Sequence, residues 1–312
     1  MTPLKGEKHL ICTGPIIRYG GKWMDRSEPF PKGQGEVRWV STDWLQDHLE
    51  DDISLLDTQP DVHDYIRSHI PSAVYLSEVS VRLFRSHLPH VWLGPQIAEL
   101  IFRQVGVWNR NPVVLYSSQG SHGAGDGLEQ AVVAYTLLKL GHKAVYILDG
   151  GYQKWRSERK EATPDYPRIE EGDFSAHLRD DLGIEHDDFK ELLGRADVVH
   201  LDSRPQAVYE GKGAWKKGGH IPGAINLPWT EFMRSENICE MRSQEDMMSA
   251  LEKAGARKDK LVLCSCGSGR KSACQFLIMK FLLGYPRIRM FENSLTEWLA
   301  EGNDTVLGPG AR

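Results

Sequence analysis

The sequence predicts an α/β protein made of two similar domains, each a mostly parallel sheet flanked by helices. Short apolar runs of strand length alternate with segments of helical periodicity, which is typical of parallel sheets with helical connections. The same order of features returns about 145 residues later, as expected for a duplicated domain. At 312 residues, the chain is also longer than one ordinary domain.

The first copy follows a stretch of glycines and prolines at residues 1–37, which we interpret as an N-terminal arm. Residues 38–158 form the first predicted domain. Its expected elements, in order, are a short helix at Trp44 and Leu45, a strand at Ile53–Leu56 ending in Asp57, a helix around Ile97–Val105, a strand at Val113–Tyr116, and a strand at Ala144–Leu148 before Asp149-Gly150-Gly151.

The second copy follows a linker at residues 159–182, spans residues 183–303 and leaves a tail at 304–312. A helix is expected at Phe189 and Leu192, and a strand at Val198–Leu201. Three features answer those of the first copy: Asp202 answers Asp57, His220-Ile221-Pro222-Gly223-Ala224 answers His69-Ile70-Pro71-Ser72-Ala73, and Trp298 answers Trp155.

Composition restricts the class of protein. Hydrophobic residues make up 40% and charged residues 26% of the chain, as in soluble globular proteins, and no apolar run reaches the roughly 18 residues of a membrane helix. A net charge of −5 favours neither nucleic acid nor a membrane as partner. Without the apolar core of a secretory signal, we expect a cytoplasmic location. Reduced thiols are expected at Cys12, Cys239, Cys264, Cys266 and Cys274.

One loop near the C-terminus predicts the chemistry. The apolar run ending at Cys264 is typical of a buried strand, and the helical spacing from Phe276 predicts a helix capped at Gly284. A glycine-containing loop at a helix N-terminus turns backbone N–H groups towards negative charge, so Cys266 should ionise readily and act as a nucleophile. The residues expected to bind the anion are Gly267, Ser268, Gly269, Arg270, Lys271 and Ser272.

Only the second copy carries this nucleophile. In the register of the repeat, Ser118 stands opposite Cys266. The segment Gly120–Gly127 resembles a phosphate cradle but lacks the Gly-Lys-Ser/Thr ending of a P-loop, and we interpret it as the inactive counterpart of the cysteine loop. No Cys-x-x-Cys or His-Glu-x-x-His spacing suggests a metal, and no cofactor is expected.

These features together resemble the tandem rhodanese family of sulfurtransferases, which includes thiosulfate and 3-mercaptopyruvate sulfurtransferases. The resemblance rests on the cysteine loop, on Leu148-Asp149-Gly150-Gly151, and on the two His-Ile-Pro motifs at His69 and His220. It implies two rhodanese-like domains, in which an inactive N-terminal copy packs against a catalytic C-terminal copy.

The resemblance also implies a ping-pong transfer through a persulfide on Cys266. A small anionic donor would load the sulfur, and cyanide or a thiol, including that of a thioredoxin-like protein, would accept it. The loop Cys266-Gly-Ser-Gly fits both thiosulfate and mercaptopyruvate enzymes, so the donor stays open. Besides a thiosulfate and a mercaptopyruvate sulfurtransferase, a third possibility is a relay module that passes the persulfide sulfur to a protein acceptor. A cysteine phosphatase is disfavoured, because its Cys-x5-Arg loop would need arginine at Ser272.

The sequence departs from the two-domain family at two places. The donor-binding arginine six residues after the strand-end aspartate is replaced by Val208, which removes an anion clamp. Arg204 matches another family arginine and is a candidate for substrate contact, while Trp215 and the nearby lysines could supply compensating contacts. Glu292-Asn293 replaces the family's Asp-Gly.

Overall fold

The computed structural model describes residues 30–85, 88–123, 125–213, 215 and 217–310, together with two short strands, β1 (Ile17–Tyr19) and β2 (Lys22–Met24), which pair antiparallel. Most of the predicted N-terminal arm, including Cys12, lies outside the described residues. Among the residues that the structure describes, none of the helices combines the length and apolarity needed to cross a bilayer.

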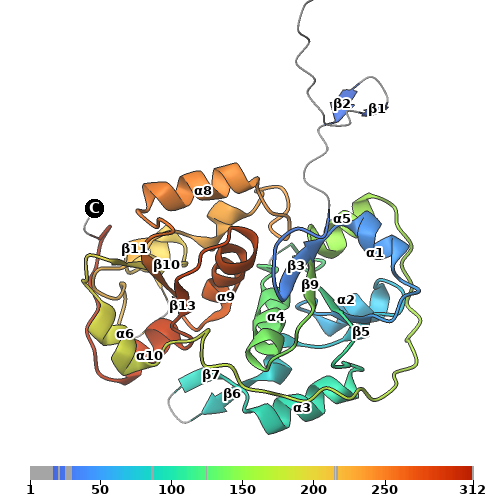
Figure 1. Ribbon diagram of the computed structural model, residues 1–312, viewed down its shortest axis with the longest axis horizontal. Coiled ribbons are helices and arrows are strands. Elements are labelled where there is room, and N and C mark those ends of the chain that lie inside the picture. Colours follow the sequence, from blue (N-terminus) through green and yellow to red (C-terminus); the bar gives the residue numbers. More distant parts are fainter. Residues whose placement is uncertain are drawn as a thin grey trace, which may run out of the picture.

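The first half of the chain folds around a five-stranded sheet (Figure 1). Its strands are β3 (Val37–Val40), β4 (Ser54–Asp57), β5 (Val74–Tyr75), β8 (Val113–Tyr116) and β9 (Val145–Leu148), in the order β3-β9-β8-β4-β5. All neighbours are parallel. Every residue of β4 and β8 is buried, as expected for strands covered on both faces.

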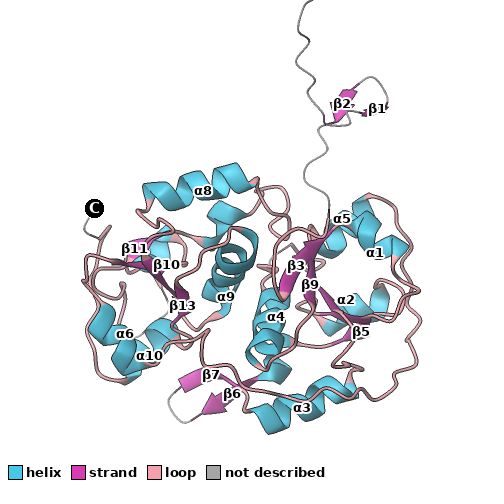
Figure 2. Ribbon diagram, in the orientation of Figure 1, coloured by secondary structure: helices cyan, strands magenta, loops and turns pink. Residues whose placement is uncertain are grey.

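Helices flank this sheet (Figure 2). They are α1 (Thr42–Asp47), α2 (Val62–Arg67), α3 (Pro95–Gln104), α4 (Glu129–Lys139), α5 (Gly151–Ser157) and the 3₁₀ turn η1 (Glu78–Val81). Side-chain caps begin α1 and α2, where the Ser41 hydroxyl and the Asp61 carboxylate accept from backbone N–H groups of the first turn.

The second half repeats the arrangement with one strand fewer. Its strands are β10 (Val198–Asp202), β11 (Ile225–Asn226), β12 (Leu261–Ser265) and β13 (Ile288–Met290), all parallel, in the order β11-β10-β12-β13. At the place that β3 holds in the first sheet, a single bridge joins Gly183 to Met290. The helical elements are α6 (His186–Leu192), α7 (Gln206–Tyr209), η2 (Trp229–Phe232), α8 (Gln244–Lys253), α9 (Arg270–Leu277), its π-helical continuation η3 (Ile278–Leu282) and α10 (Ser294–Ala300).

The predicted fold, two mostly parallel sheets flanked by helices, is confirmed. The strand expected at Val113–Tyr116 has those bounds, and Gly284 has the left-handed φ of 68° that a helix cap of this kind uses. An antiparallel hairpin of β6 (Arg82–Arg85) and β7 (Leu88–Trp92) was not predicted. Its neighbouring apolar residues Leu83 and Phe84 are both exposed, so the strand lacks a period-two pattern.

The two halves meet along α4 and α9, the helices that follow the two equivalent loops (Figure 2). The ring of Tyr135 on α4 meets Phe276 on α9 edge to face, with centroids 5.5 Å apart. The Tyr135 hydroxyl donates to Glu292 at 2.7 Å, and Lys139 pairs with the same carboxylate. This contact accounts for Glu292, which serves two side chains of the other half, whereas Asn293 donates to Glu297 on α10.

Truncation of Tyr135 tests this interface. Tyr135→Ala should lower the free energy of unfolding by about 3–5 kcal/mol, because it opens a cavity in a buried aromatic cluster. Tyr135→Phe keeps the ring and should cost only about 1 kcal/mol for the lost hydrogen bond. Urea unfolding measures both, and Leu100→Ala on the exposed face of α3 serves as the control. Equal losses for the two Tyr135 variants would contradict the packing role.

Candidate active site

The cysteine loop is four residues long, from Cys266 to Gly269, between the end of β12 and the start of α9. Gly269 ends it with a left-handed φ of 91°. A side-chain carbon at that position would lie 2.4 Å from the Glu292 carbonyl oxygen, so both the conformation and the space require glycine. The short loop therefore places Cys266 at the N-terminus of α9.

Hydrogen-bond donors surround the Cys266 sulfur. The side chain is buried, with 2% of the residue exposed. The Gly269 N–H donates to Sγ at 3.2 Å, and the Ser272 hydroxyl lies 3.5 Å away. Burial opposes ionisation, but the hydroxyl and N–H of Ser272, the Lys271 charge and the Ser268 N–H outweigh it and hold the pKa of Cys266 below the ordinary thiol value. The geometry is that of a stabilised thiolate.

The outer side of the loop is bonded to the start of α10. The Ser294 hydroxyl accepts from the Cys266 N–H at 3.0 Å and donates to the Phe291 carbonyl at 2.8 Å. The Cys266 carbonyl accepts from the Leu295 N–H, and the Gly267 carbonyl accepts from Thr296. Ser294 has a left-handed φ of 53°, which non-glycine residues rarely adopt. These bonds fix the loop so that its remaining N–H groups are free to face the sulfur.

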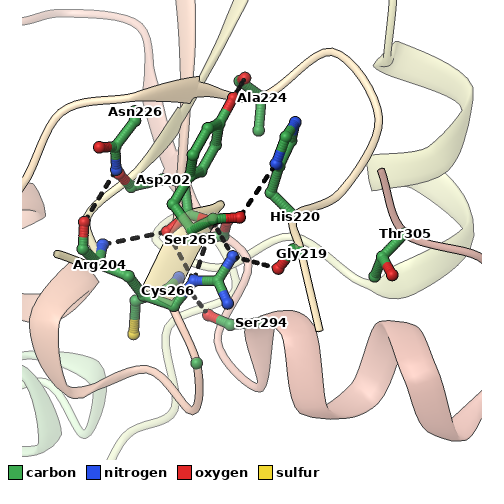
Figure 3. A network of polar contacts seen from close by, with 12 residues as sticks. Asp202, Arg204, Gly219, His220, Ala224, Asn226, Ser265, Cys266, Ser294 and Thr305 are labelled. Atoms are coloured by element: carbon green, nitrogen blue, oxygen red, sulfur yellow. Dashed lines mark hydrogen bonds and ion pairs between the residues drawn. The ribbon is translucent and has the colours of Figure 1, made fainter. Parts of the chain in front are cut away.

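A polar network braces the loop from the opposite side, with Cys266 at its edge (Figure 3). Arg204 is buried and donates to both carboxylate oxygens of Asp202 and to the Gly219 carbonyl. Asn226 donates to the Arg204 carbonyl, and the ring of His220 stacks on Tyr209 while its Nδ1 bonds to the Tyr209 carbonyl. The charge of Arg204 is therefore paired with the carboxylate of Asp202, the last residue of β10.

Trp215 covers the loop. A side-chain carbon on Gly267 would lie 2.3 Å from the Trp215 ring, and the Arg204 guanidinium lies 5.4 Å from the ring centroid. Of the lysines near Trp215, Lys217 pairs with Asp304 at the surface, and Lys216 lies outside the described residues. Trp215 thus covers the cysteine loop with an apolar ring and adds no charge.

The two basic residues at the start of α9, Arg270 and Lys271, are bound to the N-terminal half. Arg270 makes ion pairs with Glu78 at 2.7 Å, Glu129 at 2.8 Å and Asp126 at 3.0 Å. Lys271 lies 3.4 Å from Asp126. All three carboxylates come from η1, α4 and the Gly120–Gly127 segment before α4. The segment that resembles a phosphate cradle thus contributes a carboxylate that pairs with the first turn of α9.

The equivalent site of the first half is closed. Residues 117–128 separate β8 from α4, so this loop is much longer than the four-residue cysteine loop. The Ser118 hydroxyl donates to Gln59 and accepts from the Gly120 N–H. Ser117 donates to Glu129. Both serine hydroxyls are thus used in hydrogen bonds within the first half.

The described cysteines other than Cys266 are unsuited to ionisation. Cys239, Cys264 and Cys274 are free thiols buried in apolar surroundings. Burial raises the pKa of Cys274 to about 12 and the pKa values of Cys239 and Cys264 further. Among the described thiols, the low pKa is confined to Cys266.

The structure brings the predicted loop residues Cys266 to Ser272 into one site. Asp57 and His69 make their hydrogen bonds inside the first half, to Gln59 and Tyr116 and to the Tyr65 and Asp165 carbonyls. Sequence reasoning missed the contributions of Arg82, Glu78 and Ser294. The repeat register carried one signal for Ser294, since it stands where the first half has Gly151 in a left-handed conformation.

Removal of Arg270 tests the ion pairs between the halves. Arg270→Met should lower the unfolding free energy by about 3 kcal/mol at about pH 8, because it leaves buried carboxylates without their partner. Burial already raises the pKa values of Glu78 and Glu129, against the pull of Arg270. Losing Arg270 raises them further, and a raised folded-state pKa gives stability at low pH that is lost as pH rises.

The loss should therefore be smaller at about pH 5 than at about pH 8. Urea unfolding at both pH values measures it. Arg257→Met, which removes an arginine from an exposed pair with Asp259, is the matched control and should change stability by less than about 0.5 kcal/mol. A loss that does not depend on pH would contradict the electrostatic account.

Comparison with known proteins agrees with this arrangement. The family model described as a rhodanese-like domain matches residues 41–158 and 185–301. The sulfur carrier protein TtuD of Thermus thermophilus is 30% identical over 83% of this chain and 92% of its own length. The thiosulfate sulfurtransferase of Azotobacter vinelandii is 29% identical, covering 75% of this chain and 83% of the relative.

A solved structure shares the fold. The 3-mercaptopyruvate sulfurtransferase SseA of Escherichia coli superimposes with a TM-score of 0.74 and 25% identity, over 82% of this chain and 98% of its own. Because rhodanese-like domains span both halves, and relatives covering most of the chain are sulfurtransferases, the chain belongs to the rhodanese-like family as a two-domain sulfurtransferase.

Proposed function

We propose that Cys266 carries a sulfane sulfur as a persulfide, taking it from thiosulfate or a related small anionic donor and passing it to cyanide or a thiol. The observation that carries this proposal is the donor set around the Cys266 sulfur at the start of α9. Oriented N–H groups at a helix N-terminus stabilise an anion whether it is a thiolate or a persulfide. The same cradle therefore serves both halves of a ping-pong reaction.

Both steps of this sulfur transfer conserve atoms and electrons without a cofactor. The Cys266 thiolate attacks the outer sulfur of thiosulfate, the S–S bond of the donor breaks, and sulfite leaves with the electron pair. Cyanide then attacks the outer sulfur of the persulfide and leaves as thiocyanate, which restores the thiolate. A persulfide is a low-pKa anion, so it needs hydrogen-bond donors rather than a general base.

The loop residues take different roles in this proposal. Gly267, Ser268, Gly269 and Ser272 offer backbone N–H groups and, at Ser272, a hydroxyl. Arg270 acts mainly through the carboxylates that it binds in the first domain, whereas Lys271 lies near Asp126 and its charge also favours the Cys266 thiolate. Arg204 belongs to the supporting network, since Asp202 and the Gly219 carbonyl already occupy its Nε and Nη2.

Two related functions are alternatives, one with a different sulfur donor and one with a different acceptor. The similarity to a 3-mercaptopyruvate sulfurtransferase supports mercaptopyruvate as an alternative donor, and the similarity to a sulfur carrier protein supports a relay to a protein acceptor. A comparison of transfer rates to cyanide, to a small thiol and to reduced thioredoxin distinguishes an enzyme for small acceptors from a relay. We also propose a reducing compartment such as the cytoplasm, because the thiol must be reduced before it takes up sulfur.

Intact-mass measurement after incubation with thiosulfate tests the proposal. The wild type should gain one sulfur atom, and cyanide should remove it. Cys266→Ser should gain none, whereas Cys274→Ser, the matched control at a buried thiol, should behave as the wild type. A wild type that stays unmodified with thiosulfate and with mercaptopyruvate would reject the persulfide mechanism.

A further inference from the structure

Arg82 reaches the cysteine loop from the opposite domain. It begins β6 of the hairpin between η1 and α3, and 6% of the residue is exposed. Its Nη2 donates to the Ser268 carbonyl in the loop, and Nε and Nη2 donate to the His90 carbonyl at 3.0 and 2.6 Å. A side-chain carbon on Gly269, whose N–H donates to the Cys266 sulfur, would lie 3.6 Å from Nη2. The guanidinium is therefore a neighbour of the reacting sulfur.

The acceptors bonded to Arg82 are neutral, and one donor is unused. Both are backbone carbonyls, and Nη1 has no hydrogen-bond partner although it is buried. A buried donor without an acceptor costs about 1–3 kcal/mol, so such an atom indicates a missing partner. Burial also lowers the pKa of Arg82 to about 10, while the nearby charges of Glu78 and Cys266 partly restore it.

Trp92 supplies a second unused donor beside Arg82. Its ring centroid lies 5.1 Å from the Arg82 guanidinium carbon, and its buried Nε1 also has no partner. Two adjacent buried donors without acceptors point to a group rich in acceptor atoms.

The other arginines at the site are paired with carboxylates. Arg270 binds three of them, and Arg204 binds Asp202 through Nε and Nη2, although its buried Nη1 also has no partner. The position at which the family resemblance leads us to expect a donor-binding arginine holds Val208. We propose that Arg82, with Trp92 beside it, binds the anionic oxygen atoms of the sulfur donor, so that the first domain supplies the anion recognition that Val208 lacks. This assignment rests on the proposed function and names its substrate class, a small donor bearing a sulfonate-like or carboxylate group.

The test compares two alkylating reagents of similar shape and different charge. Iodoacetate and iodoacetamide both react with the Cys266 thiolate, which displaces iodide and forms a carbon–sulfur bond. Both rates are proportional to the fraction of Cys266 that is ionised, so this fraction cancels in their ratio. The ratio therefore reports the preference of the site for the anionic reagent over the neutral one. Mass spectrometry of the Cys266 peptide follows each reaction.

Arg82→Met should lower the iodoacetate-to-iodoacetamide ratio about tenfold, since a charge-assisted hydrogen bond is lost. Trp92→Phe replaces the indole with a phenyl ring that has no N–H, and it should lower the ratio about threefold for the lost neutral donor. Arg82→Lys keeps the charge and should give a ratio between those of Arg82→Met and the wild type. Arg257→Met, at an exposed arginine, should leave the ratio unchanged.

Thermal melting shows which variants are folded, and the ratio is read on those. If Arg82→Met and Trp92→Phe both show the wild-type ratio, the assignment is wrong. If Arg82→Met does not fold, wild-type ratios in Arg82→Lys and Trp92→Phe overturn it instead. The readout is separate from sulfur transfer. A protein that forms a persulfide but shows no dependence of the ratio on Arg82 rejects this inference alone, whereas a protein with the expected ratios and no persulfide rejects the proposed function alone.

Discussion

The site depends on the hydrogen bonding that the start of α9 offers the Cys266 sulfur, through the Gly269 N–H and the Ser272 hydroxyl. A buried thiol is normally harder to ionise, as the other described cysteines show. Only a very short loop can bring a helix N-terminus to the thiol, and Gly269 makes this loop possible through its left-handed conformation. The corresponding loop of the first domain has twelve residues, 117–128, and there the side chains of Ser117 and Ser118 bond to Glu129 and Gln59 instead.

The residues that follow the loop tie the second domain to the first. Arg270 and Lys271 follow the loop directly, and their partners Glu78, Asp126 and Glu129 all belong to the first domain. The α4–α9 contact and the Tyr135–Glu292 hydrogen bond hold the same surfaces together. The first domain therefore pairs the positive charges at the start of α9. It also contributes Arg82, which donates to the Ser268 carbonyl in the loop.

The repeat, the parallel sheets and the place of Cys266 at a helix N-terminus could be predicted from the sequence, because they depend on local patterns: apolar runs, helix caps and a glycine loop at a strand end. The partners of Arg270 could not, because they lie more than a hundred residues away and no periodicity relates them. The hairpin that carries Arg82 was missed for a similar reason, since its exposed Leu83 and Phe84 do not alternate with polar residues. Contacts between domains were thus the part that needed the structure.

The most direct measurement is the ultraviolet titration of thiolate absorbance in the native protein, with Cys266→Ser as the reference. The account predicts one thiol that ionises with a pKa below the ordinary thiol value, and this transition should be absent in Cys266→Ser. Since the pKa is lowered, the thiolate should be present at a lower pH than in a free cysteine. A Cys266 transition at or above the ordinary thiol pKa would contradict the account.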